Sequence, residues 1–290
     1  MTRTFTVAAP DGARLQVQEW PATGPADAPT VVLAHGWTLT RASWLPVVEQ
    51  LVARGLRVVA YDQRGHGGSG PLRGQPSVRA LGDDLAAVLD VVAPTGPVVL
   101  GGHSMGGMTV MAYAGLHPES FASRVAGVVL VATSAGDLKG TGLGSVEAWA
   151  MRFAARLPQL RAGRLVTTRG QRALLFGADA DPEHVRLTRQ QVADTTLPTM
   201  GRFFSALAEH DEAEALAQFE GVQTVVLVGD RDKLTPKRHA IRLAELVPHA
   251  ELQVLPGRGH MLAYEATDEV VAAFTTLLDG LPDTHSADRS

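Results

Sequence analysis

Six short apolar runs, rich in β-branched residues and bounded by glycine or polar residues, constrain the fold of this chain most strongly. Runs of this kind are typical of parallel strands that are buried on both faces of a sheet. Two further segments, 5–7 and 15–20, alternate apolar and polar residues around Pro10-Asp11-Gly12, which predicts a strand, a turn and a second strand. The six runs are TVVLAH (30–35), LRVVAY (56–61), PVVLGG (97–102), VAGVVLV (125–131), TVVLVG (224–229) and ELQVLP (251–256).

Segments with helical spacing of their apolar residues lie between these runs. The clearest is 77–92, in which Leu81, Leu85, Val88 and Leu89 share one helix face. Similar patterns indicate helices at 43–54, 105–116, 240–247 and 265–278. Strands that alternate with helices predict an α/β fold with a doubly wound, mostly parallel sheet.

The alternation stops between residues 137 and 217, where no strand-like run occurs. Four helix-forming segments indicate a helical cap inserted over the sheet; the alternative is a small second domain without a catalytic role. We therefore predict an α/β core formed by 1–136 and 218–280, a cap formed by 137–217, and a disordered tail at 281–290. The helix-forming segments of the cap are 146–157, 170–176, 182–192 and 200–217.

Composition excludes several classes of function. The chain has 290 residues, which suffices for one large domain, and 26 Lys+Arg against 30 Asp+Glu give a net charge of -4, so no basic patch favours nucleic acid. There is no cysteine, which excludes disulfides, thiolate metal sites and cysteine catalysis. We expect no metal, because no cluster has metal-ligand spacing, and no cofactor, because GRGHGGSG is not a nucleotide-binding loop.

The first residues, MTRTFTVAAPDG, lack the apolar stretch of a signal peptide. No apolar run approaches the ~18 residues of a membrane span. We therefore expect a cytoplasmic enzyme that acts on a small molecule, and the sequence leaves its oligomeric state open.

The segment Gly102-His103-Ser104-Met105-Gly106 has the pattern G-x-S-x-G, which alone is weak evidence. Here it follows an apolar strand and precedes a helix of small residues, the context that places a serine nucleophile on a sharp turn. Glycines two residues before and after the serine allow the strand and the helix to approach each other. The helix N-terminus would also place positive charge near a developing oxyanion.

Five motifs in this order resemble those of the α/β-hydrolase superfamily. Apart from the predicted cap, they span the chain from about residue 30 to 278, so the resemblance implies an α/β-hydrolase fold. The motifs are His35-Gly36-Trp37, Asp62-Gln63-Arg64-Gly65-His66-Gly67-Gly68-Ser69, Gly102-His103-Ser104-Met105-Gly106-Gly107, VLVGDRDKLTP (226–236) and GRGHML (257–262).

The resemblance implies a catalytic triad of Ser104, Asp232 and His260. His260 would be the base that activates Ser104, because a serine hydroxyl is a poor nucleophile at its own pKa. Asp232 would orient His260 and stabilise its charged form. Asp230 is interpreted as a loop cap, and Asp137 remains an alternative acid because some relatives place the acid there.

The resemblance also implies an oxyanion hole formed by the backbone N–H groups of Trp37 and Met105. The side chain of Trp37 would wall the substrate pocket as well. Asp62 and Arg64 are expected to form a buried ion pair that braces their loop, since an unpaired buried charge is costly. His35, His66 and His103 are interpreted as structural.

We call the sharp turn formed by residues 102–106 the elbow. A serine nucleophile at the elbow favours acyl chemistry, so we expect a serine hydrolase that cleaves a carboxylic ester or related acyl bond of a small, apolar substrate. The motifs around Trp37 and Asp62 also resemble the cofactor-free haloperoxidase (perhydrolase) branch. An acyltransferase, a C–C bond hydrolase and a non-enzymatic receptor remain alternatives. Phe203 and Phe204, adjacent in a predicted cap helix, are candidate substrate contacts, and only one of the two rings can easily point inwards.

Overall fold

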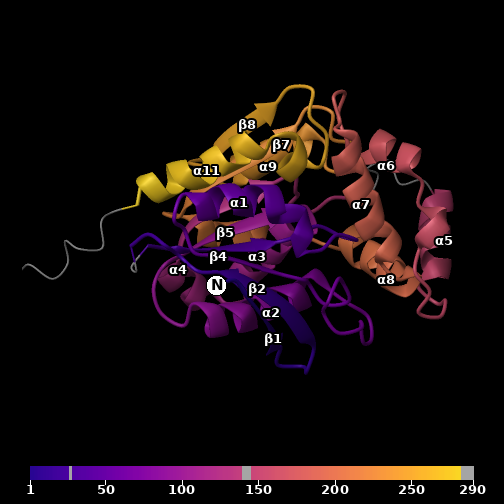
Figure 1. Cartoon of the computed structure of the whole chain (residues 1–290), viewed down its shortest axis with the longest axis horizontal. Helices are drawn as coiled ribbons and strands as arrows, with labels where there is room; N and C mark the ends of the chain where they lie inside the picture. The colour runs from indigo at the N-terminus through magenta and orange to yellow at the C-terminus, as the bar shows by residue number, and fades with distance from the viewer. Residues whose placement is uncertain (26–27, 139–144, 282–290) are drawn as a thin grey trace, which may run out of the picture.

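A computed structural model describes residues 1–25, 28–138 and 145–281 and shows a central eight-stranded sheet between two layers of helices (Figure 1). Apart from Leu281, the predicted tail at 281–290 lies outside the described residues. The strands are β1 (Arg3–Ala8), β2 (Arg14–Trp20), β3 (Thr30–Ala34), β4 (Val58–Tyr61), β5 (Val98–His103), β6 (Val125–Val131), β7 (Gln223–Gly229) and β8 (Glu251–Leu255).

The order of strands in the sheet is β1-β2-β4-β3-β5-β6-β7-β8. The two N-terminal strands form an antiparallel hairpin, and β2 pairs antiparallel with β4. From β4 to β8 every neighbouring pair is parallel. The doubly wound, mostly parallel sheet expected from the six apolar runs is thus confirmed, and each run supplies one parallel strand.

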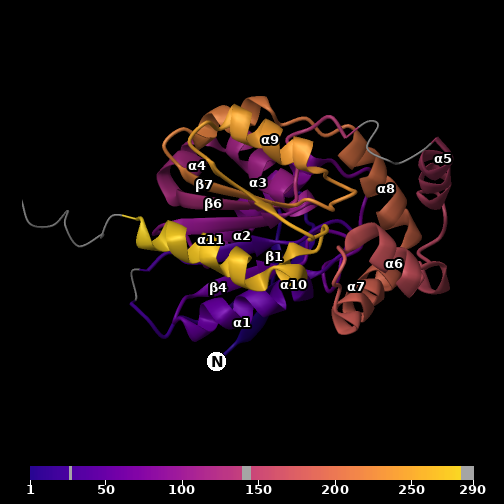
Figure 2. The ribbon, with the colours of Figure 1, turned by 90° about the horizontal axis from the view of Figure 1, so that it is seen from above.

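Helices cover both faces of the sheet (Figure 2). Helices α2 (Val78–Val92), α3 (Met105–Leu116) and α9 (Lys237–Leu246) pack on one face, where they share a core with the strands. Helices α1 (Leu45–Ala53) and α11 (Thr267–Asp279) pack on the other. The shorter helices α4 (Pro118–Arg124) and α10 (Leu262–Glu265) follow α3 and precede α11 along the chain.

Four helices form a cap beyond the carboxyl ends of the parallel strands (Figures 1 and 2). Helix α5 packs against α8, and α6 packs against α7. Threonine side chains before α6 and α8 accept hydrogen bonds from the first-turn N–H groups, which explains where these helices begin. The cap helices are α5 (Ser145–Ala154), α6 (Thr168–Leu175), α7 (Pro182–Asp194) and α8 (Leu197–Ala208).

The helix predicted over 200–217 is wrong in its second half. Helix α8 ends at Ala208, and the chain then returns to the body, where Asp211 pairs with Gly136 and the N–H of Glu212 donates to the carbonyl of Ala135. A short 3-10 helix, Glu214–Phe219, follows and packs against α3. The pairing with Gly136 interrupts the helix, and the local spacing of apolar residues contains no sign of it.

Candidate active site

Ser104 lies on the turn between β5 and α3, at φ 52° and ψ -118°. A positive φ is rare for any residue other than glycine and marks a strained turn. Hydrogen bonds from the body hold this conformation: the Ser104 N–H donates to the carbonyl of Val131, and its carbonyl accepts from the hydroxyl of Thr133 at 2.7 Å. The side chain of Ser104 is thereby presented at the carboxyl end of β5.

The glycines of the elbow are required by close backbone contacts. A Cβ atom on Gly102 would lie 2.5 Å from the carbonyl oxygen of Gly106, and one on Gly106 would lie 2.1 Å from that of Ala34. No side chain fits at either position without a backbone shift. The strand and the helix therefore approach each other as closely as the sequence pattern predicts.

His260 and Asp232 are joined by a hydrogen bond of 2.8 Å between Nδ1 and Oδ2, and both side chains are buried. The other carboxylate oxygen accepts from the N–H groups of Leu234 and Thr235, and Oδ2 also accepts from the Thr235 hydroxyl. Burial alone would raise the pKa of Asp232, but His260 and Thr235 hold it below its ordinary value. With Nδ1 donating to an ionised Asp232, the Nε2 atom of His260 can accept a proton.

The two competing acids lie elsewhere. Asp230 accepts a hydrogen bond from the N–H of Gly257 at 2.8 Å, which caps the loop as expected. Asp137 contributes to a different hollow, which it shares with His239. Asp232 is thus the carboxylate placed to act on His260.

Ser104 and His260 line one cavity of about 250 Å³ between the sheet and the cap. Among the described residues that line it there is no Asp, Glu, Lys or Arg. The described residues include no hydrogen bond between the Ser104 hydroxyl and His260; catalytic contacts of this kind often tighten only when substrate binds. The apolar wall includes Trp37, Leu39, Met108, Met151, Leu174, Leu175, Val192, Met200, Phe204, Leu207, Leu234 and Met261.

The two adjacent phenylalanines of α8 have different positions. Phe204 lines the cavity and lies 6.0 Å from Trp37, measured between ring centroids. Phe203 is fully buried against His66 and Met105 in the core and does not line the cavity. The expected substrate contact is therefore corrected for Phe203, because adjacent residues of a helix point about 100° apart.

The backbone N–H groups of Trp37 and Met105 donate no hydrogen bond to any described residue. In the loop after β3, the N–H that follows that of Trp37 belongs to Thr38, and it donates to Nε2 of His66 at 3.2 Å. Trp37 is part of the cavity wall, and Met105 directly follows Ser104. These two donors are therefore available to serve as the oxyanion hole that the sequence predicts.

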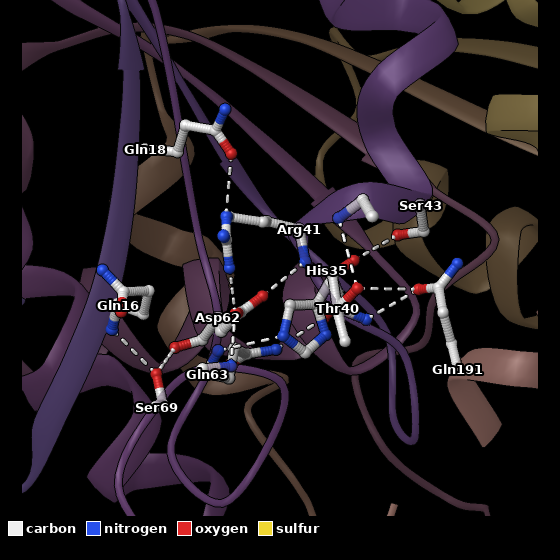
Figure 3. A network of polar contacts seen from close by, with 12 residues as sticks. Gln16, Gln18, His35, Thr40, Arg41, Ser43, Asp62, Gln63, Ser69 and Gln191 are labelled. Carbon is white, nitrogen blue, oxygen red and sulfur yellow. Dashed lines mark hydrogen bonds and ion pairs between the residues drawn. The ribbon is translucent and has the colours of Figure 1, made fainter. Parts of the chain in front are cut away.

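The loop after β3 is held by a polar network (Figure 3). The carboxylate of Asp62 accepts from the Arg41 N–H at 2.7 Å, pairs with the Arg41 guanidinium and accepts from the Gly68 N–H. Arg64 instead pairs with Asp84 of α2 at 2.6 Å. The predicted Asp62–Arg64 pair is therefore wrong: both ions are paired, each with a residue distant in sequence.

Three buried histidines brace the same loops from the body. Nε2 of His35 accepts from the Gln63 N–H, and Nε2 of His103 donates to the carbonyl of His260 at 2.8 Å. Burial lowers the pKa of His35 to about 4, and lowers those of His66 and His103 to about 3. All three are neutral near pH 7, which agrees with their structural interpretation.

The cap contacts the loop that carries Trp37. The side-chain oxygen of Gln191, in α7, accepts from both the N–H and the hydroxyl of Thr40, at 2.9 and 3.0 Å (Figure 3). The hydroxyl of Thr195, at the end of α7, donates to the carbonyl of Thr38 at 3.1 Å. Helix α7 thus helps to fix the backbone that presents the Trp37 N–H.

The cap also contacts the loop that carries His260. The N–H of His260 donates to the carbonyl of Leu175 at 2.7 Å, and the N–H of Ala178 donates to that of Gly257. A Cβ atom on Gly177 would lie 2.0 Å from the carbonyl oxygen of Gly257. The two backbones therefore touch directly, with no room for a side chain.

Glu265 joins these two segments. Its carboxylate accepts from the N–H groups of Gly177, Gly259 and Met261, at 2.7 to 3.2 Å. Burial raises the pKa of Glu265 although these three N–H groups oppose the shift. One side chain thus holds the cap and both neighbours of His260.

Thr235, Gln191 and Glu265 were not identified from the sequence. Thr235 has a local signal, because an Asp often accepts from backbone N–H groups two and three residues later in a turn. Gln191 and Glu265 lie in helical segments and have no such signal. Their roles depend on contacts between parts of the chain that are distant in sequence.

Within the ranges that the structure covers, we find no helix with the length and hydropathy that a bilayer crossing requires. The same ranges contain no group of three His, Cys, Asp or Glu side chains placed to hold a metal ion.

Comparison with known proteins identifies the family. The family model described as alpha/beta hydrolase fold matches residues 29–267. The chain is 28% identical over 294 residues to a non-heme haloperoxidase of Rhodococcus erythropolis, covering 94% of this chain and 98% of the relative. It is 36% identical to a bifunctional esterase/perhydrolase of Acinetobacter calcoaceticus over 109 residues, which are 38% of each chain.

Among solved structures, a thermophilic esterase from Thermogutta terrifontis superimposes with a TM-score of 0.78 at 25% identity, covering 96% of this chain and 98% of the esterase. The matched family region contains Ser104, Asp232 and His260 and extends across the cap. This chain belongs to the α/β-hydrolase family.

Proposed function

We propose that this protein is a serine hydrolase that cleaves a carboxylic ester, or a related acyl bond, of a small apolar substrate. One observation carries the proposal: Ser104, on a strained turn, shares an apolar cavity with His260, whose Nδ1 donates to the buried Asp232. A nucleophile, a base and a group that orients the base are the parts that acyl transfer requires.

The reaction follows from this geometry. The Ser104 oxygen attacks the substrate carbonyl carbon while its proton passes to Nε2 of His260, and Asp232 stabilises the imidazolium. The N–H groups of Trp37 and Met105 donate to the oxyanion. His260 then protonates the leaving alcohol as its bond to the acyl carbon breaks. Water, deprotonated by His260, attacks the acyl-enzyme, which releases the carboxylic acid and restores Ser104.

The cavity supports a small, uncharged acyl group. Its volume of about 250 Å³ lies below the roughly 300–1,000 Å³ of pockets that hold drug-sized ligands. A charged acyl group would be desolvated there without an Asp, Glu, Lys or Arg partner among the described lining residues, which is costly. Trp37 and Phe204 would contact the acyl group directly.

Perhydrolysis is a second candidate because hydrogen peroxide could replace water on the same acyl-enzyme, and a relative has perhydrolase in its name. The lining of the cavity favours water. Its wall contains the thioethers of Met108, Met151, Met200 and Met261. A peracid formed there would oxidise these side chains to sulfoxides and make an apolar cavity polar.

The test uses p-nitrophenyl esters of graded acyl length. Wild-type protein should prefer short acyl groups, and Ser104→Ala should lower kcat by about 10⁴-fold or more. Ser123→Ala, at an exposed serine, is the control and should retain full activity. A serine-directed organophosphate should label Ser104 alone.

Three results would contradict the proposal. Ser104→Ala could retain more than about one hundredth of kcat, which is incompatible with a nucleophile. The wild-type protein could bind esters without turnover, as a receptor would. With added hydrogen peroxide the main product could be the peracid, or with an added alcohol the transferred ester, in place of the free acid.

A further inference from the structure

A second hollow, of about 430 Å³, lies beside the cap and is lined by four cationic side chains. They are Arg169 and Arg172 from α6, and Arg231 and Lys233 from the loop that carries Asp232. No Asp or Glu occurs among the described residues that line it. Neither the active-site cavity nor the proposed reaction uses any of these four cations.

Helix α6 separates this hollow from the active-site cavity. Arg169, Arg172 and Ala173 line the hollow, whereas Leu174 and Leu175 line the cavity. At 3.6 residues per turn the first three share one helix face and the other two share the opposite face. The helix therefore presents a basic face outward and an apolar face towards the substrate.

The loop after β7 has the same two-sided arrangement. Arg231 and Lys233 line the hollow, while Asp232 is buried against His260 and Leu234 lines the cavity. The two residues next to the proposed catalytic acid in the sequence, Arg231 and Lys233, thus both line the hollow. A ligand bound there would contact the cap and the acid-bearing loop at once.

Two of the four cations already make contacts across the hollow. Nζ of Lys233 donates to the carbonyl of Ala173 at 2.5 Å, which links the loop to α6. The guanidinium of Arg172 donates to the carbonyl of Ala178 at 3.3 Å. Each has further N–H donors beyond these bonds.

The other two cations keep their donors available. Arg169 and Arg231 make no side-chain hydrogen bond with the described residues, and the contact of Arg231 with Asp230 is a long one of 3.8 Å. Four like charges around one hollow repel each other, and a bound anion would relieve that repulsion. The planar guanidinium groups suit the paired oxygens of a phosphate.

We propose that this hollow binds a free multivalent phosphate anion, because α6 separates it from the apolar cavity that holds the proposed substrate. Bound phosphate would bridge α6 and the Asp232 loop and hold the cap against the body on that side. The proposal goes beyond the proposed hydrolase function and does not depend on it, since binding can be measured without turnover.

The test titrates the full-length protein with inorganic pyrophosphate by calorimetry, at constant ionic strength set with chloride, and follows the melting temperature in parallel. We expect one saturable site and a rise in melting temperature. Arg169→Gln with Arg231→Gln removes two cations but no side-chain hydrogen bond, and should weaken binding by about tenfold or more. Arg186→Gln with Arg242→Gln, two exposed arginines elsewhere, makes the same change in charge and should leave binding unchanged.

A second arm tests whether the phosphate is instead carried by a substrate. Pyrophosphate should not compete with turnover of an uncharged p-nitrophenyl ester or of an aryl ester that bears a phosphate on its leaving group, and the double variant should leave both KM values unchanged. Competition with the phosphorylated ester alone would overturn the proposal of a free-anion site. Absence of saturable binding, or equal affinity in the double variant and the wild type, would overturn the proposal.

Discussion

The nucleophile and the groups that serve it are held in different ways. The elbow is held entirely within the body: Gly102 and Gly106 permit the turn, and the backbone of Ser104 bonds to the adjacent strand β6 and the residues after it. His260 and Trp37 lie on loops that are braced by side chains from distant parts of the chain. Some of these braces come from the body and others from the cap.

The comparison indicates that the cap does more than cover the substrate. Gln191 and Thr195 fix the loop of the proposed oxyanion hole, and the backbone around Gly177 fixes the loop of His260. A change in the cap should therefore alter catalysis without touching Ser104. The predictions below test this difference between support from the body and support from the cap, in order of decreasing expected effect.

The largest effect should come from acid, which charges the histidines that brace the loops from the body. The pKa values of His35, His66 and His103 are lowered to about 3–4 in the folded protein, so the unfolded chain takes up protons first as the pH falls below about 6.5. The stabilisation that these neutral histidines provide is complete above about pH 6.5 and is lost as the pH falls towards their folded pKa values of about 3–4. Each group contributes about 1.4 kcal/mol per pH unit, or about 4 kcal/mol for the three.

Unfolding free energies measured between pH 7 and 4.5 check this prediction. The dependence on pH should be steep and should become shallower by about a third in His103→Gln. The exposed His249→Gln serves as the control and should change the slope little. Equal stability at pH 7 and pH 5 would show that the body does not hold these loops through neutral histidines.

The second largest effect concerns Asp232, the proposed acid of the catalytic triad. Asp232→Asn should lower kcat by about 10⁴-fold, because an amide no longer selects the tautomer of His260 that can accept a proton from Ser104. Asp230→Asn is the matched control, since Asp230 only caps the neighbouring loop. Steady-state kinetics on both variants decide the assignment. A larger loss from Asp230→Asn would mean that the acid has been assigned to the wrong carboxylate.

Support that comes through the cap should matter next. Glu265→Gln replaces a carboxylate that accepts three N–H groups with an amide that can accept at only one end. We expect kcat to fall by about 10–100-fold with little change in KM, because a small displacement of His260 affects the transition state most. Glu119→Gln, at an exposed position in α4, should leave kcat unchanged.

The split between kcat and KM separates a positioning role from a merely structural one. A positioning role predicts a lower kcat at an unchanged KM in Glu265→Gln. A variant with a lower melting temperature but an unchanged kcat would show that Glu265 only stabilises the fold.

The smallest effect should come from the wall of the cavity. Phe204→Ala should shift acyl-length preference by tens-fold, since the loss of one apolar contact is worth about 1–3 kcal/mol of discrimination. Phe203→Ala removes a fully buried ring and should instead destabilise the protein by about 3–5 kcal/mol while leaving relative rates unchanged. Melting curves and an ester panel on both variants test this pair. Equal selectivity in the two variants would remove α8 from the substrate pocket.

The parts of the fold that follow from local pattern could be predicted from the sequence. The apolar runs gave all the parallel strands because a strand buried on both faces must be apolar along its length. The helix over 200–217 was predicted too long because the chain leaves α8 to pair Asp211 with Gly136. That pairing joins segments far apart in sequence, which no local periodicity records.

The candidate site divides in the same way. Ser104, Asp232 and His260 could be proposed from the sequence because each lies in a short motif at the end of a strand, and the structure joins His260 to Asp232 by a hydrogen bond. The ion-pair partners of Asp62 and Arg64 were not predicted correctly. These two residues lie two positions apart, but their loop directs Asp62 to Arg41 and Arg64 to Asp84.

The backbone contact at Gly177 has a consequence for anyone who recombines caps among these enzymes. A graft that introduces any side chain at this position would place a carbon atom 2.0 Å from the carbonyl oxygen of Gly257. The exchange would then push the His260 loop out of place even if the new cap folded well. Chimeras should therefore be cut so that Gly177 and Gly257 come from the same parent, together with Glu265.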